Sequence, residues 1–348
     1  LQIEEDLIEE VARMVGYDHL PTTAPSAPTR PRVRPERLRG PYAVRRLVAG
    51  LGYQETINYS FVQAEWEHTL AGNDDPIQLL NPIASQMSVM RSSLIGGLLQ
   101  VVKFNTDRKA TRVRVFEVGR VFLRDDRVTD TDTTVQGFDQ PMRVAGVSYG
   151  PLQPLQWDQS ERAADFYDVK ADVQALLMPA QATFEPAEHP AMHPGRCARV
   201  MLHGQVVGHV GELHPRWRQQ WDLPLAPVVF ELEWTALTRK DVPQFQGVSR
   251  QQAVERDIAL VVTEAVTHDQ LMRSVHAAPT HGLLRHAVLF DVYRPKQAAA
   301  GLNMGEKSLA VRLTLQDDAA TLTETQIETA VAAVVAQVQK DLAARLRA

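Results

Sequence analysis

The chain has 348 residues, which at roughly 150 residues per domain indicates two domains, or three if one is small. Its net charge of −5 excludes a polybasic protein that binds through bulk charge, and its 44% of apolar residues excludes a disordered chain. Its single cysteine, Cys197, excludes an internal disulfide, and no apolar stretch is long enough to span a membrane. A reducing, cytoplasmic location is therefore expected.

A helix and a proline-rich linker are predicted at the start of the chain. Apolar residues recur every three or four positions from Ile3 to Met14, which predicts an amphipathic helix over residues 3–15. Five prolines between residues 21 and 35 predict an extended linker and hence a domain boundary. The chain opens inside the helical pattern and without methionine, so we expect it to be part of a longer protein.

Residues 36–240 are predicted to form an α+β domain built mainly on an antiparallel sheet. Helical patterns cover residues 38–51, 93–105 and 166–177. Apolar or alternating runs predict strands at residues 112–122, 144–149, 198–202, 206–210 and 228–233. The polar segment 124–140 has no periodicity and is expected to be a loop or a hairpin tip.

The last part of the chain, residues 247–348, is predicted to be a ferredoxin-like domain. Strand and helix patterns follow one another in the order β-α-β-β-α-β, at residues 256–262, 267–277, 284–293, 307–316, 324–339 and 344–347. A Thr323-x-x-Gln326 capping box opens the second helix. In this motif both helices cover one face of the sheet and leave the other bare.

Alternation along the third strand assigns its side chains to the two faces of this sheet. Apolar residues at positions 309, 311, 313 and 315 must point to the helices. Ser308, Arg312 and Thr314 are therefore expected to point outward.

The second strand is expected to add an aromatic ring to the bare face. If Val288, Phe290 and Val292 point to the helices, Asp291 and Tyr293 point outward. An aromatic ring beside an arginine is what single-stranded RNA loops need. A merely solvated face is the alternative, and the 11 basic and 11 acidic residues between positions 247 and 348 favour it.

Three acidic side chains at the start of the chain can converge on one helix face. Glu9 and Glu10 lie three and four residues after Asp6, so like charges crowd together, and a hard cation such as Mg²⁺ would relieve their repulsion. A solvated polar face opposite the apolar stripe is the simpler interpretation, and the spacing alone favours it.

A basic cluster follows, opposed only by Glu36. It consists of Arg30, Arg32, Arg34, Arg37, Arg39, Arg45 and Arg46. This cluster could contact RNA phosphate or an acidic partner, and a solvated linker is an equal alternative.

A zinc site at His189, His193 and Cys197 is disfavoured. Pro190 and Pro194 prevent the helix that would place the two histidines on one face, and no fourth ligand is evident. Nucleophile-elbow and Walker-type phosphate motifs are also absent from the sequence.

Several segments, in order along the whole chain, carry a resemblance to a known family. Five of them are Leu79-Leu80-Asn81-Pro82-Ile83, Val115-Phe116-Glu117-Val118-Gly119, His193-Pro194-Gly195-Arg196, Glu255-Arg256-Asp257-Ile258 and Phe290-Asp291-Val292-Tyr293. In this order they resemble the β subunit of bacterial phenylalanyl–tRNA synthetase. The resemblance implies four parts: residues 1–20 as the end of the B5 domain, residues 21–35 as a linker, residues 36–240 as the class II synthetase-like, pseudo-catalytic B6–B7 domain, and residues 247–348 as the anticodon-binding domain.

The resemblance also implies a non-catalytic role. Class II ligases hold ATP with an arginine in an Arg-x-Glu strand and another in a glycine-rich motif. Here Arg114 and Glu117 are one residue too far apart, which turns them to opposite faces of a strand, and the glycine-rich motif is missing. Without those cations, the charge that develops during phosphoryl activation is not stabilised.

Partners and ligands follow from the same resemblance. The partner α subunit would carry the active site and use ATP, in an (αβ)2 heterotetramer. The anticodon stem-loop of tRNA(Phe) would contact Tyr293, Lys307, Ser308, Arg312 and Thr314. Mg²⁺ would bind Asp6, Glu9 and Glu10 together with an aspartate that precedes Leu1, so the site would be incomplete in this chain.

Two other functions are alternatives to this one. A free-standing ferredoxin-like module that senses an amino acid would need paired ferredoxin-like units, and the sequence contains one. The absence of the two ATP-binding arginines argues against a ligase that is active by itself.

Overall fold

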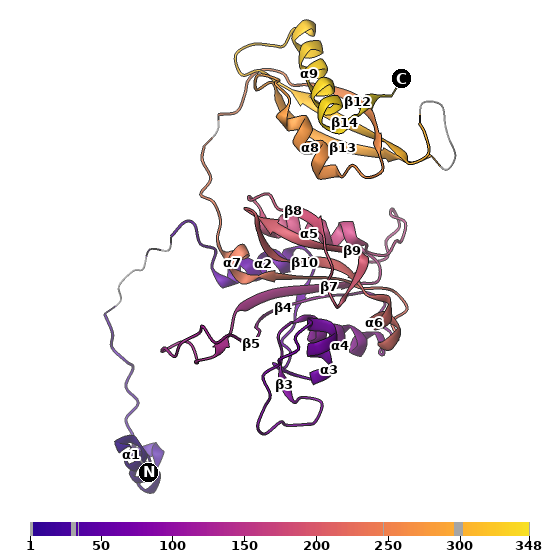
Figure 1. The fold of residues 1–348 in the computed structure, drawn as a ribbon. Helices are drawn as coiled ribbons and strands as arrows, with labels where there is room; N and C mark the ends of the chain where they lie inside the picture. The colour runs from indigo at the N-terminus through magenta and orange to yellow at the C-terminus, as the bar shows by residue number, and fades with distance from the viewer. Residues whose placement is uncertain (1–2, 29–32, 34, 246, 296–301, 348) are drawn as a thin grey trace.

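A computed structural model describes residues 3–28, 33, 35–245, 247–295 and 302–347 (Figure 1). The first predicted helix forms as α1 (Glu4–Val15) and is followed by a 3₁₀ turn, η1 (Tyr17–His19). α1 buries none of its residues, so the apolar stripe that predicted it is exposed. Residues 21–28 of the proline-rich segment contain no helix or strand. Within the described ranges, no helix is long and apolar enough to cross a membrane.

Residues 41–238 form a seven-stranded sheet with helices on both faces, which we call the large-sheet domain (Figure 1). The strand order is β1-β4-β7-β11-β10-β9-β8, and each neighbouring pair is antiparallel except β1 and β4. The strands are β1 (Gln54–Glu55), β4 (Val113–Arg120), β7 (Met142–Tyr149), β8 (Thr183–Pro186), β9 (Met192–Leu202), β10 (Gln205–Leu213) and β11 (Val228–Glu233). The helices are α2 (Pro41–Gly50), α3 (Ala64–Trp66), the π-helix η2 (Glu67–Ala71), α4 (Ile95–Thr106), α5 (Phe166–Leu177), α6 (Pro215–Gln220) and α7 (Trp234–Thr238).

Each face of the large sheet has its own apolar core. On one face α4 packs through Leu98 against residues such as Val115, and on the other α2 and α5 pack through Val48 and Val173 against Phe116. Because both faces are covered, the central strands β7 and β11 are buried along most of their length. The predicted α+β class with an antiparallel sheet is confirmed.

Two short paired segments complete this domain. β2 (Phe61–Val62) pairs with β3 (Val89–Met90), and β5 (Leu123–Arg124) pairs with β6 (Phe138–Asp139). The segment 124–140 is therefore the tip of a hairpin, one of the two predicted possibilities.

The C-terminal elements form the ferredoxin-like domain. They are β12 (Val254–Thr263), α8 (His268–Ala277), β13 (Leu284–Tyr293), β14 (Glu306–Leu315), α9 (Glu324–Leu342) and β15 (Arg345–Leu346). The sheet order is β13-β14-β12-β15, antiparallel throughout. Capping boxes open both helices, with Thr267 and Gln270 on α8 and Thr323 and Gln326 on α9. The predicted ferredoxin-like order is confirmed.

Candidate nucleic-acid interface

The sheet of the ferredoxin-like domain has one face packed on its helices and one outer face. On β14, Val311 and Leu313 are fully buried against residues of α8 and α9. Arg312 lies between them in the strand, is exposed, and is opposite Asp257 of β12. Thr314, half-buried, is on the same outer face opposite Glu255. The predicted alternation on this strand is confirmed for Arg312 and Thr314.

Two register shifts in β13 set the faces of the second strand. After the first, between Leu284 and His286, Val288 is opposite Arg312 on the outer face, and the second, a β-bulge, follows Leu289. Leu289 is opposite Val311, but the next paired residue, Asp291, is opposite Ala310, so Phe290 is the extra residue. The prediction that Val288 and Phe290 point to the helices is wrong. They are 41% and 52% exposed, and Val288 is opposite Arg312.

Beyond the bulge, the expected alternation resumes. Val292 is opposite the buried Leu309, and Tyr293 is opposite Ser308 on the outer face. Tyr293 is 42% exposed, and the Arg347 guanidinium lies 5.0 Å from its ring centroid. Arg347 was missed by the sequence analysis, because only the pairing of β15 with β12 brings the end of the chain to this face.

The Arg312 guanidinium is held by carboxylates of the neighbouring strand. Its Nε and Nη2 atoms donate to Asp257 at 2.8 and 2.9 Å, and Nη1 lies 3.3 Å from Glu255 Oε2. This pairing lowers the pKa of Asp257 and raises the pKa of Arg312. Arg312 also lies 5.4 Å from the Phe290 ring centroid. Its charge is therefore compensated within the protein, which makes a phosphate contact by Arg312 less favourable.

Two of the predicted RNA-binding residues are not accessible on the outer face. Lys307 is 7% exposed and points to the other side of the sheet, where its Nζ donates to the Glu264 carbonyl at 2.9 Å. Ser308 is on the outer face but only 4% exposed, between Tyr293 and Val261 in the register. The accessible part of the interface is therefore Phe290, Tyr293, Arg312, Thr314 and Arg347.

The acidic residues of α1 do not form a complete cation site. Asp6 Oδ2 accepts the Ile3 backbone N–H at 3.4 Å, and Glu10 pairs with Arg13. Across the residues with described positions, no group of three or more His, Cys, Asp or Glu side chains is placed to hold a metal ion. The donors present do not fit Mg²⁺ by themselves, and its ligation by Asp6, Glu9 and Glu10 stays a prediction.

The histidines and cysteine weighed as zinc ligands have other surroundings. The His189 ring lies 5.2 Å from that of His209, and burial lowers the pKa of His189 to about 4. Cys197 is buried beside Met192, and burial raises the pKa of its thiol to about 11. The raised pKa of Cys197 disfavours the thiolate, which is the form of cysteine that binds a metal.

The basic cluster of residues 30–46 is partly used inside the protein. Arg39 donates to the backbone carbonyls of Leu176 and Met178 at the end of α5, and Arg45 pairs with Glu55 at 2.6 Å. Positions 30, 32 and 34 lie outside the described residues. RNA or partner binding by this cluster stays a prediction.

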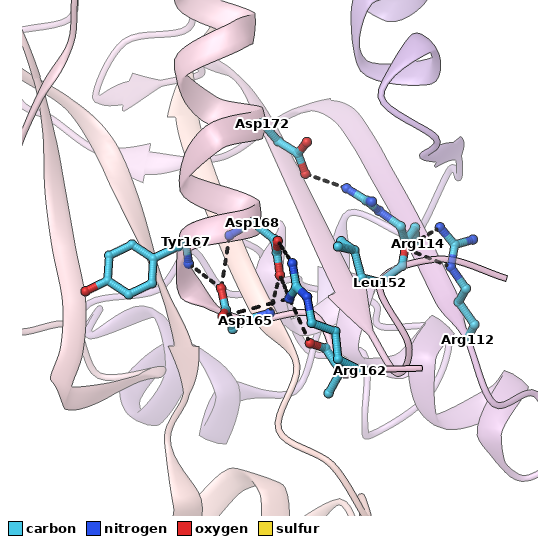
Figure 2. A network of polar contacts seen from close by, with 9 residues as sticks. Arg112, Arg114, Leu152, Arg162, Asp165, Tyr167, Asp168 and Asp172 are labelled. Carbon is cyan, nitrogen blue, oxygen red and sulfur yellow. Dashed lines mark hydrogen bonds and ion pairs between the residues drawn. The ribbon is translucent and has the colours of Figure 1, made fainter. Parts of the chain in front are cut away.

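On β4 the side chains of Arg114 and Glu117 point to opposite faces of the sheet, as predicted. Figure 2 shows the Arg114 guanidinium directed at Asp172 of α5, with Arg112 beside it directed at Leu152. On the other face, Glu117 pairs with Arg91 at 2.7 Å. The charges of Arg114 and Glu117 are thus neutralised by side chains of the protein.

Two cavities in the described part of the large-sheet domain are too small for a nucleotide. One, lined by residues 152–156 and 159–162, has a volume of about 50 Å³. A second, beside Trp66 and Ser93, has about 10 Å³. Pockets that bind small molecules usually measure roughly 300–1,000 Å³.

Known protein families match both the large-sheet domain and the ferredoxin-like domain. The family profile described as phenylalanyl tRNA synthetase beta chain CLM domain matches residues 20–234, and that of the ferredoxin-fold anticodon binding domain matches residues 249–347. A phenylalanine–tRNA ligase beta subunit from Ralstonia nicotianae is 51% identical over all of this chain and 44% of its own length. One from Cupriavidus pinatubonensis is 49% identical over all of this chain and 43% of its length.

The chain thus spans less than half the length of these relatives. A solved pyrrolysyl tRNA synthetase from Desulfitobacterium hafniense has a TM-score of 0.39 and 10% identity over 56% of this chain and 64% of its own. The match of the family profile to most of the large-sheet domain decides the assignment. The chain belongs to the phenylalanyl-tRNA synthetase β-chain family.

Proposed function

We propose that the chain is the non-catalytic, tRNA-binding and scaffolding part of a phenylalanine–tRNA ligase, the enzyme that attaches phenylalanine to its tRNA with ATP. The observation that carries this proposal is the outer face of the ferredoxin-like domain, where Tyr293 and Phe290 are exposed beside Arg347 and Arg312. The anticodon stem-loop of tRNA(Phe) is the ligand of this face. The unpaired bases of an anticodon loop can stack on such rings.

The contacts on this face favour recognition of bases over bulk attraction to phosphate. The domain has 11 basic and 11 acidic residues between positions 247 and 348, and Arg312 is neutralised by Asp257 and Glu255. Binding through bulk charge would require an excess of basic side chains. Affinity therefore comes from a few contacts, with Tyr293 as the central one.

A separate α subunit completes the enzyme, as an (αβ)2 heterotetramer in the cytoplasm, and binds ATP. Two features support this division of labour. Arg114 and Glu117 of β4 are neutralised within the chain, and the large-sheet domain exposes apolar side chains such as Leu80 (97%) and Ile83 (75%) in one loop. Exposed apolar side chains grouped in this way favour a protein partner.

The purified chain should not catalyse adenylate formation. Pyrophosphate exchange with phenylalanine and ATP should stay at background, because Arg91 and Arg114 are paired with Glu117 and Asp172. The whole ligase serves as the positive control. Exchange by the chain at a rate comparable to the whole ligase would contradict the non-catalytic role.

Replacing Tyr293 with alanine should weaken binding of the anticodon stem-loop. If a base stacks on this ring, the loss is roughly 1–3 kcal/mol, or about 5- to 150-fold in affinity. Binding is measured in the whole ligase by titration with labelled stem-loop RNA. Tyr293→Phe keeps the stacking surface and should retain most of the affinity. Equal affinities for the alanine variant and the unchanged protein would place RNA elsewhere.

A further inference from the structure

We propose that Phe290 forms a second nucleobase-stacking position on the outer face, separate from that of Tyr293. This inference rests on the proposed function, because it assigns a second contact to the same RNA ligand. The first observation is the position of Phe290 at the bulge of β13, where it is the residue without a partner on β14. Because Leu289 is opposite the buried Val311, alternation places the ring of the next residue, Phe290, on the outer face.

Phe290 presents apolar surface on the outer face of the sheet. Phe290 is 52% exposed, while its neighbour Leu289 packs against the core. Large apolar side chains are favoured inside, so a ring presented on an open sheet face is suited to contact a flat apolar ligand. A nucleobase has such a flat surface, and stacking tolerates any base.

Arg312 fixes the position of this ring before RNA arrives. Its guanidinium lies 5.4 Å from the ring centroid, donates two hydrogen bonds to Asp257 and forms an ion pair with Glu255. A ring that is already ordered loses less conformational freedom on binding. Arg312 is therefore a positioning residue, and its compensated charge contributes little phosphate attraction.

The two rings are far enough apart to serve different nucleotides. Phe290 and Tyr293 are three residues apart, roughly 10 Å along a strand that rises about 3.3 Å per residue. Each ring has its own arginine, Arg312 for Phe290 and Arg347 for Tyr293. With two separate stacking positions, a domain that has little net charge can still select an RNA loop.

The test measures binding of anticodon stem-loop RNA to the whole ligase with Phe290→Ala. We expect affinity to fall roughly 5- to 150-fold with an unchanged salt dependence, because a stacking contact and no phosphate contact is lost. Phe290→Trp should restore affinity. Val288→Ala is the matched control, since Val288 is an exposed apolar residue on the same strand and face, and it should bind within about twofold.

A set of RNAs, each lacking one loop base, identifies the nucleotide. At one loop position, removal of the base should make Phe290→Ala and the unchanged protein bind alike, and that position should differ from the one sensitive to Tyr293→Ala. If Tyr293→Ala weakens binding while Phe290→Ala does not, the second position is absent and the proposed function stands. If the unchanged protein does not bind the stem-loop, the proposed function fails too. A loss with Phe290→Ala that is equal for every RNA of the set would contradict a stacking role.

Discussion

Replacing Arg91 with methionine should lower the free energy of unfolding of the large-sheet domain by about 3–5 kcal/mol. The side chains of Arg91 and Glu117 are 5% and 3% exposed, and their atoms Nη1 and Oε1 are 2.7 Å apart. Without the guanidinium, the Glu117 carboxylate stays buried with the Asn58 amide, at 2.7 Å, as a neutral partner. Urea unfolding followed by tryptophan fluorescence measures this domain, because all five tryptophans of the chain lie in it: Trp66, Trp157, Trp217, Trp221 and Trp234.

The control removes both charges of this pair. In Arg91→Met/Glu117→Leu no buried charge lacks a partner, so much of the lost stability should return. A single variant that costs less than about 1 kcal/mol would show that water reaches the pair and that Glu117 is not held as described.

Replacing Leu313 with alanine should destabilise the ferredoxin-like domain by about 2–5 kcal/mol. Leu313 is fully buried on β14, in a core shared with Leu271 of α8 and Val334 of α9. Removal of three side-chain carbon atoms there leaves a cavity that the paired strands can close only in part. Hydrogen exchange of the backbone amides of β12 and β14 measures the loss, because this domain has no tryptophan.

Thr314→Ala is the matched control on the outer face of the same strand. It removes no core contact and should change stability by less than about 0.5 kcal/mol. The tryptophan transition of the large-sheet domain should be the same in both variants, since its cores contain no residue of β12 to β15. A shift of that transition in Leu313→Ala would contradict separate cores.

The order of elements could be predicted because local patterns determine it. Apolar residues two apart on β14, and capping boxes such as the one at Thr323, depend only on neighbours in the sequence. The same holds for the opposite orientations of Arg114 and Glu117 on β4. The predictions of these features were correct without any knowledge of which strands pair.

The arrangement of the candidate interface depended on contacts that local patterns do not reveal. Val288, Phe290 and Val292 alternate as a regular strand would, yet the register shift between Leu284 and His286 places Val288 on the outer face, and only Val292, beyond the second shift, is opposite an inward-facing residue. The burial of Lys307 beside Glu264 and the approach of Arg347 to Tyr293 both join parts of the chain distant in sequence. Such features follow from pairing and packing, so alternation alone could not give them.

If the outer face of the ferredoxin-like domain binds the anticodon, footprinting of tRNA(Phe) on the whole ligase shows this most directly. With the unchanged protein, the anticodon loop should be protected from ribonuclease. With Tyr293→Ala, the loop should become cleavable again while protection elsewhere on the tRNA remains, because only the stacking contact of this face is removed. Loop protection that is the same in both proteins would contradict anticodon binding at this face.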